Sequence, residues 1–220
     1  MGLFDKIKAM RLNSQKKSWE SNGDTLKKIV TTKEQRLEAL EALNDAPGEF
    51  AVPQLMKRFE IIIDHGMQDR SEKEKVMEIL LRHGDISKPY VRAAVQTSKR
   101  VSWPIKVAEK LFSHEEYLLL LLECINPSFV SFDETVQERN AELLLALKET
   151  PDARVAPRVA PLLKIRDESV RIAALECLES QGAQHDEARA AIKDLATEIA
   201  GTENARFLGL VKGILTSHGW

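Results

Sequence analysis

The 220-residue chain has little of several features on which common classes of protein depend. Its only two cysteines, Cys124 and Cys177, each lie within an apolar helical pattern, which favours buried thiols over a disulfide. The longest apolar run, Tyr117 to Leu122, is far shorter than the roughly 18 residues of a membrane span. The first ten residues lack the apolar core of a secretory signal, so we expect a cytoplasmic location.

Aromatic residues make up only 5% of the chain, and no stretch shows the sustained alternation of a strand. Hydrophobic residues reach 43% and charged residues 30%, a balance that is typical of a soluble protein with a core. Because Leu, Ala, Glu and Lys dominate, the composition predicts an all-α fold. The net charge of −2 indicates no general attraction to nucleic acid.

The sequence motifs of common active sites are also missing. The chain has no GxSxG, GxxxxGK[ST], GxGxxG or HExxH pattern, and no histidine pair has metal-ligand spacing. The carboxylates lie among lysines and arginines at helical spacing, as on a solvated surface. We therefore predict no catalytic residue, no metal site and no cofactor, although an active site built from residues distant in sequence stays an alternative.

Regular turn signals divide the sequence into alternating first and second helices of about six pairs. The signals include Asn22-Gly23-Asp24, Asn126-Pro127-Ser128 and Gln181-Gly182. First helices are predicted at 24–31, 48–63, 86–98, 114–125, 152–165 and 184–200. Second helices are predicted at 33–44, 71–83, 102–113, 134–149, 168–180 and 202–217.

The second helices follow a common frame. "RLEALEAL" (36–43) matches "RIAALECL" (171–178) in residue type, and "KEKVMEIL" (73–80) fits the same frame. The frame ends at leucines spaced 37, 31, 36 and 31 residues apart, namely Leu43, Leu80, Leu111, Leu147 and Leu178. A period in the thirties with one helix pair per unit is typical of an α-solenoid, whose units stack to share a core.

The clearest unit, residues 152–182, resembles the HEAT-repeat (armadillo-like) family. The resemblance rests on Asp167, Val170 and Arg171 in "DESVRIAALECL" and on prolines within first helices, such as Pro53 and Pro161. Asp69 and Lys73 have the same spacing, and Thr32 with Arg36 and Thr202 with Arg206 repeat it more weakly. The resemblance implies a right-handed α–α superhelix over residues 24–220, with Asp and Arg forming ladders between repeats.

Residues 1–23 form a separate basic segment in composition. Residues 1–28 carry seven basic and three acidic residues, a net charge of +4, which leaves −6 for residues 29–220. Leu3, Phe4, Ile7 and Met10 would share one helix face. This segment could cap the apolar end of the solenoid, or it could contact a partner or an anionic membrane through residues 1–20.

The absence of catalytic motifs makes a non-catalytic interaction scaffold or adaptor the leading hypothesis, with a protein or peptide segment bound on the concave face. Candidate binding residues are Arg36, Lys73, Lys75, Trp103, Lys106, Arg139 and Arg171. Arg36 and Arg171 have an alternative structural role in ion pairs. Trp103 could instead wedge between helices, and the apolar segment 114–125 could form a dimer contact.

Two other functions remain as alternatives. A HEAT-fold enzyme or enzyme subunit, such as a DNA glycosylase or a bilin lyase, would fit the size of the chain. Duplex binding calls for a basic surplus that residues 29–220 lack, so nucleic acid is disfavoured. The third alternative is a peripheral membrane adaptor that uses the N-terminal helix.

Overall fold

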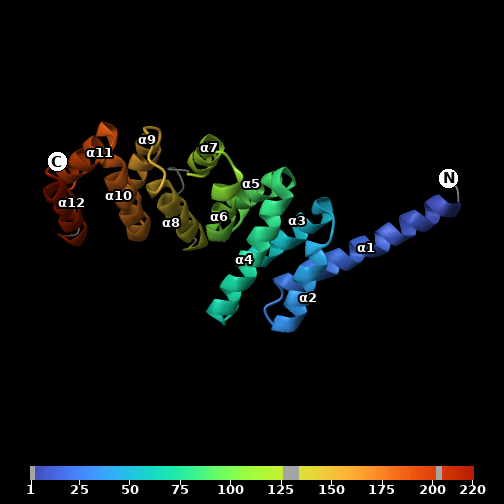
Figure 1. The fold of residues 1–220 in the computed structure, drawn as a ribbon. Coiled ribbons are helices and arrows are strands. Elements are labelled where there is room, and N and C mark those ends of the chain that lie inside the picture. The colour runs from blue at the N-terminus through green and yellow to red at the C-terminus, as the bar shows by residue number, and fades with distance from the viewer. Residues whose placement is uncertain (1–2, 126–133, 202–204) are drawn as a thin grey trace. The chain divides into compact units, whose positions relative to one another are not determined.

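The computed structural model describes residues 3–125, 134–201 and 205–220, and within these ranges every regular element is a helix (Figure 1). The all-α fold that the composition predicted is thereby confirmed. None of the helices in these ranges has both the length and the apolar character needed to cross a bilayer. Contacts between residues divide the chain into two units, residues 1–113 and 114–220.

The first unit contains three helix pairs in its described residues. One short 3₁₀ turn lies within the second pair and another joins the second pair to the third. Each second helix contacts the first helix of its pair, and α2 contacts α4 as α4 contacts α6. Its elements are α1 (Leu3–Lys27), α2 (Lys33–Asn44), α3 (Gly48–Met56), η1 (Lys57–Glu60), α4 (Gly66–His83), η2 (Gly84–Ile86), α5 (Lys88–Thr97) and α6 (Ser102–Leu111).

The second unit repeats this arrangement, with α8 against α10 and α10 against α12. Its elements are α7 (His114–Cys124), α8 (Glu134–Lys148), α9 (Val155–Val159), η3 (Ala160–Lys164), α10 (Glu168–Gly182), α11 (Asp186–Glu198) and α12 (Ala205–His218). The predicted break at 126–128 and the predicted role of Thr202 lie outside the described residues.

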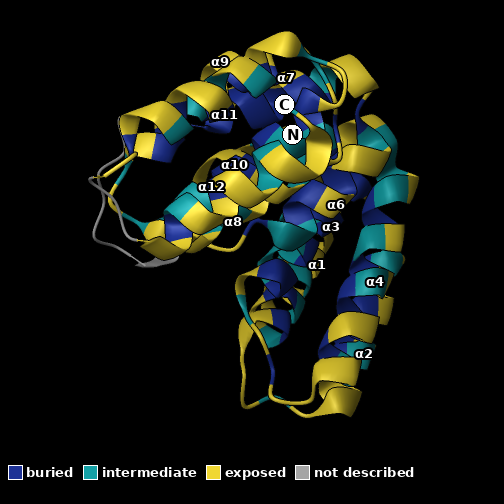
Figure 2. Ribbon diagram, turned by 90° about the vertical axis from the view of Figure 1, so that its left-hand side faces the viewer, coloured by how far each residue is buried: buried dark blue, intermediate teal, exposed yellow. Residues whose placement is uncertain are grey.

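The closing leucines of the repeat frame lie in the core. Leu43, Leu80, Leu147 and Leu178 have no exposed surface, and Leu111 is half-buried. Figure 2 shows buried residues on the sides of helices that face neighbours, with exposed residues on the opposite sides. The common frame of the second helices therefore marks the residues that each unit buries between its own helices.

Two side chains cap the starts of second helices. Thr32 forms a capping box with Gln35 at the start of α2, and Asp167 accepts a hydrogen bond from the Val170 amide, 2.9 Å away, at the start of α10. Helix α10 ends at Gly182, where the Trp220 ring occupies the space that a side chain would need. Trp220 thus packs against the end of the clearest repeat unit.

The predicted helix break at Asn22-Gly23-Asp24 is wrong, and so is the separate helix predicted at 24–31. Helix α1 runs through this point from Leu3 to Lys27. Gly23 is buried against α3, where an added Cβ would lie 2.3 Å from Gln54 Oε1 and 3.1 Å from Gln54 Cα. The glycine is needed for close helix packing and not for a turn, so tertiary contact overrides the local signal.

Two first helices are shorter than predicted, because each ends in a 3₁₀ segment. The predicted 48–63 becomes α3 and η1, and the predicted 152–165 becomes α9 and η3. Pro161 lacks the amide hydrogen that would continue α9, so the chain tightens after Val159. Directly after η1 the chain is extended at Ile61, and α4 begins at Gly66.

The close approach at Gly23 generates a stability prediction. Gly23→Ala should destabilise the first unit by about 1–3 kcal/mol, because α1 must move away from the backbone of Gln54. Gly213→Ala in α12 meets no atom within 4 Å and should stabilise the protein by about 0.5–1 kcal/mol. Urea unfolding followed by circular dichroism measures both changes, and stabilisation by both substitutions would contradict the packing account.

Candidate functional site

A groove between α2 and α4 is the candidate site of the first unit. It consists of two adjoining cavities of about 570 Å³ and about 220 Å³, which share Leu37 and Lys75. The larger cavity is also lined by Lys33, His65, Met67, Gln68, Ser71 and Glu72, and the smaller by Leu40, Glu41, Asn44, Glu78, Ile79 and Arg82. The lining residues recur at three- and four-residue spacing, so each helix gives one face to the groove.

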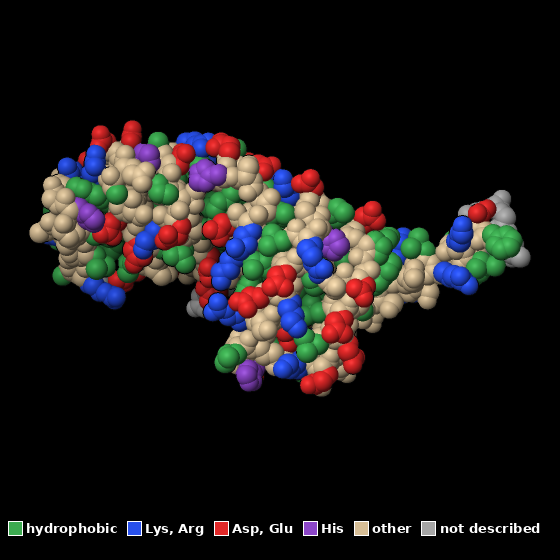
Figure 3. All heavy atoms as spheres, viewed as in Figure 1, with side chains coloured by type: hydrophobic (Ala, Val, Ile, Leu, Met, Phe, Trp, Pro, Cys, Tyr) green, Lys and Arg blue, Asp and Glu red, His purple; other side chains and the backbone are tan. Residues whose placement is uncertain are grey.

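The groove combines an apolar floor with charged edges. Half-buried Leu37 supplies apolar surface, Leu40 and Ile79 lie almost fully buried at the bottom of the groove, and Met67 at one end is 84% exposed. The exposed charged residues at its edges are Lys33, Lys75, Arg82, Glu41 and Glu78. Figure 3 shows charged side chains of both signs around hydrophobic ones over α2 and α4. Such a surface suits an amphipathic segment with its apolar side on the floor.

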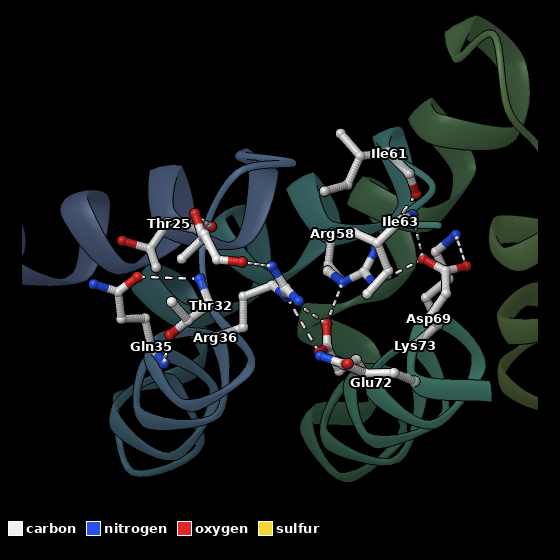
Figure 4. A network of polar contacts seen from close by, with 12 residues as sticks. Thr25, Thr32, Gln35, Arg36, Arg58, Ile61, Ile63, Asp69, Glu72 and Lys73 are labelled. Carbon is white, nitrogen blue, oxygen red and sulfur yellow. Dashed lines mark hydrogen bonds and ion pairs between the residues drawn. The ribbon is translucent and has the colours of Figure 1, made fainter. Parts of the chain in front are cut away.

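A buried network of charges joins α2, η1 and α4 beneath the larger cavity (Figure 4). Glu72 is its centre: Arg36 Nε donates to both carboxylate oxygens at 2.9 and 3.1 Å, and Arg58 Nε donates to Oε2 at 3.0 Å. Gln68 Nε2 donates to Glu72 Oε1 at 2.8 Å. Because Glu72 and Gln68 also line the groove, the network fixes one end of its floor.

Asp69 extends the network along the first turns of α4. Its Oδ1 accepts from Arg58 Nη2 at 2.8 Å and from the Ile63 amide at 3.2 Å, and its Oδ2 accepts from Lys73 Nζ at 2.7 Å. The remaining donors reach backbone carbonyls, Arg36 that of Thr31 and Arg58 that of Ile61. These bonds tie the turn at 61–65 to the start of α4.

The network holds three basic side chains and two carboxylates, and the pKa values of Asp69 and Lys73 are both lowered, for different reasons. Burial alone would raise the pKa of Asp69, but hydrogen bonds from Lys73, Arg58 and the Ile63 amide outweigh it and lower this pKa. Burial lowers the pKa of Lys73 despite its ion pair with Asp69, and the nearby Arg58 and Arg100 act in the same direction.

Two of the predicted binding residues, Arg36 and Lys73, belong to this network. They are 4% and 3% exposed, and their charges face Glu72 and Asp69. The sequence left open a structural role for Arg36 in an ion pair, and its buried pair with Glu72 agrees with that alternative. Neither side chain has surface to offer a partner, so we leave both out of the binding surface that we propose below.

Lys75, Trp103 and Lys106 lie on the surface of the first unit, in two places. Lys75 is exposed at the edge of the groove. Trp103 is half-buried and stacks on Phe59 with ring centroids 6.0 Å apart, while Lys106 Nζ lies 4.7 Å from the centre of the Trp103 ring. Trp103 therefore joins α6 to η1, as expected of a wedge between neighbouring elements.

The other two predicted residues, Arg139 and Arg171, belong to the second unit. Arg139 is half-buried on α8. Arg171 is half-buried on α10, and its guanidinium carbon lies 3.9 Å from the centre of the Phe207 ring on α12. This contact joins successive second helices, which is a packing role. The seven predicted residues are thus distributed over separate places in two units.

Sequence reasoning missed Arg58 and Glu72, although they are central to the site. Arg58 has no exposed surface, but the sequence predicted that it lies near the end of a helix, where an arginine is usually exposed. One signal was present for the neighbouring carboxylate, since Asp69 in the first turn of α4 suits the positive end of the helix dipole. The arginines that pair with them, Arg36 and Arg58, come from two other elements, which no local pattern identifies.

The described side chains offer no group of three or more His, Cys, Asp or Glu residues that could hold a metal ion. Comparison of the chain with protein-family models, curated proteins and solved structures gives no match. The resemblance to HEAT repeats therefore stays a prediction from the residues of 152–182.

The central position of Glu72 generates a second prediction. Glu72→Gln should destabilise the first unit by about 3–5 kcal/mol, because it leaves Arg36 and Arg58 buried without a counter-charge. The matched control is Glu74→Gln on the same helix, which removes an exposed partner of Arg70 and should change the unfolding midpoint little. Equal midpoints for the two variants in urea would contradict the assignment of Glu72.

The lowered pKa of Asp69 predicts a pH dependence of stability. A carboxylate whose folded pKa is depressed stabilises the fold above its unfolded pKa, and this stability is lost as pH falls through the folded value. The free-energy gap between wild type and Asp69→Asn should be full at pH 7 and should shrink as pH falls below about 4. Urea titrations at a series of pH values measure this gap, and a constant gap down to pH 3 would refute it.

Proposed function

We propose that the chain is a non-catalytic scaffold that binds an amphipathic segment of a partner protein in the groove between α2 and α4. The single observation that carries this proposal is the groove itself, with its apolar floor between charged edges. Helix-in-groove recognition places the apolar face of one segment against such a floor. Leu37 and Lys75, which line both cavities, supply the floor and the edge at the middle of the groove.

The charges at the edges favour a partner segment with acidic residues. Three exposed basic side chains stand there against two exposed acidic ones, and Glu72 is already occupied by Arg36 and Arg58. An acidic segment would complement this surplus and would be steered toward it at low ionic strength. Met67, exposed at one end, supplies an adaptable apolar contact.

The fold that we propose for this scaffold is a HEAT-like right-handed superhelix. Six consecutive helix pairs, contacts between successive second helices within each unit, and buried closing leucines support it. The Asp69–Lys73 pair supports a role for charged residues at the corresponding turns. In such a solenoid the second helices form the surface on which partners bind.

Selection from a displayed library of random peptides about four helical turns long tests the function directly. The full chain should enrich peptides with apolar residues at helical spacing and acidic residues between them. Leu37→Asp and Lys75→Glu should each weaken binding of the enriched peptides by at least about 10-fold, since each changes the middle of the groove.

Lys110→Glu is the control, because Lys110 is an exposed lysine of α6 that does not line the groove. It makes the same change of charge as Lys75→Glu and should leave binding unchanged. Failure to enrich any peptide, or binding that is insensitive to both groove variants, would contradict the proposed site.

A further inference from the structure

The first half of α1 presents an apolar face that nothing in the described first unit covers. Phe4 is 81% exposed and Met10 is 64% exposed, and Ile7 between them is half-buried. Figure 1 shows this half of α1 running out beyond α2 and α3. Of the roles that the sequence left open for this segment, a cap would bury these side chains, whereas a contact with a partner or a membrane would leave them exposed, as they are here.

This apolar face is not a continuation of the face by which α1 packs onto its unit. Trp19, Gly23 and Leu26 are on the packed side: Trp19 stacks on Phe50, Gly23 meets Gln54, and Leu26 is fully buried. At ~100° per residue, Phe4, Ile7 and Met10 are centred roughly 125° around the helix from those three residues. If the first half of α1 only continued the surface that packs on the unit, its apolar residues would lie on the same side as Trp19, Gly23 and Leu26.

Basic residues border the apolar face, and the acidic residue of this segment is on the far side. Residues 3–19 contain five basic residues and one acidic residue. Helical spacing places Lys6 and Lys8 on the two borders of the face and Arg11 within it, whereas Asp5 is on the opposite side. Figure 3 shows hydrophobic and basic side chains next to one another at the far end of α1.

We infer that this half of α1 docks on an anionic lipid surface, with Phe4, Ile7 and Met10 in the boundary between headgroups and acyl chains. Lysine and arginine side chains that border an apolar face can reach lipid phosphates while their stems lie along the apolar surface. A peptide partner would also meet the apolar face, but the basic borders specifically complement a surface of negative headgroups. This inference goes beyond the groove between α2 and α4 and depends on different residues.

Co-sedimentation of the full chain with vesicles tests the inference. The wild-type chain should sediment with vesicles that contain phosphatidylserine and stay in solution with vesicles of phosphatidylcholine alone, and added salt should weaken the binding. Phe4→Ser combined with Met10→Ser should weaken binding at least about 10-fold. Leu12→Ser is the matched control, because Leu12 is also exposed on α1 but points to another side, and it should bind like wild type.

A second set of variants separates charge from apolar contact. Removing three charges by Lys6→Gln, Lys8→Gln and Arg11→Gln should weaken binding by roughly 100-fold. The same loss of charge at the exposed lysines Lys99, Lys110 and Lys193 should have a much smaller effect. Circular dichroism checks that the helix content of every variant equals that of wild type.

Three results would overturn the inference. No sedimentation with either vesicle would assign the face to a protein partner instead. Equal binding to neutral and anionic vesicles would remove the role of the basic borders. Equal loss for Leu12→Ser and for the Phe4/Met10 variant would show that the apolar face has no specific role.

Discussion

The carboxylate of Glu72 is the contact on which the arrangement of the first unit depends. It accepts hydrogen bonds from Arg36 of α2 and Arg58 of η1 while it is itself almost fully buried on α4. Charges removed from water are stable only when they are paired and hydrogen-bonded, so the three elements must meet in one geometry. The network therefore contributes more to the uniqueness of this arrangement than to its net stability.

The groove follows from the same contact. Helices α2 and α4 meet only lightly along their length, and the charge network holds them near the starts of both helices. The pairing of Arg36 with Glu72 sets the separation of the two helices at this end. Leu37 and Met67 then keep apolar surface within reach of a partner, which is the property that an interaction scaffold needs.

Helix positions and the core could be predicted from the sequence, because both follow from local periodicity. The second helix predicted at 33–44 has the bounds of α2, and the buried closing leucines lie where the common frame placed them. Gly23 shows the limit of this reasoning, since a turn signal was overridden by contact with Gln54. The site was less predictable, because Arg36, Arg58 and Glu72 come from three different elements and meet only when the turn at 61–65 is folded.

The central claim is that α2 and α4, held by buried charges, form the surface that a partner occupies. Hydrogen exchange of the full chain, with and without an enriched peptide, tests it most directly. Binding should slow amide exchange in residues 33–44 and 66–83 and leave the second unit unchanged. Slowed exchange confined to residues 114–220, with none in α2 or α4, would contradict the account.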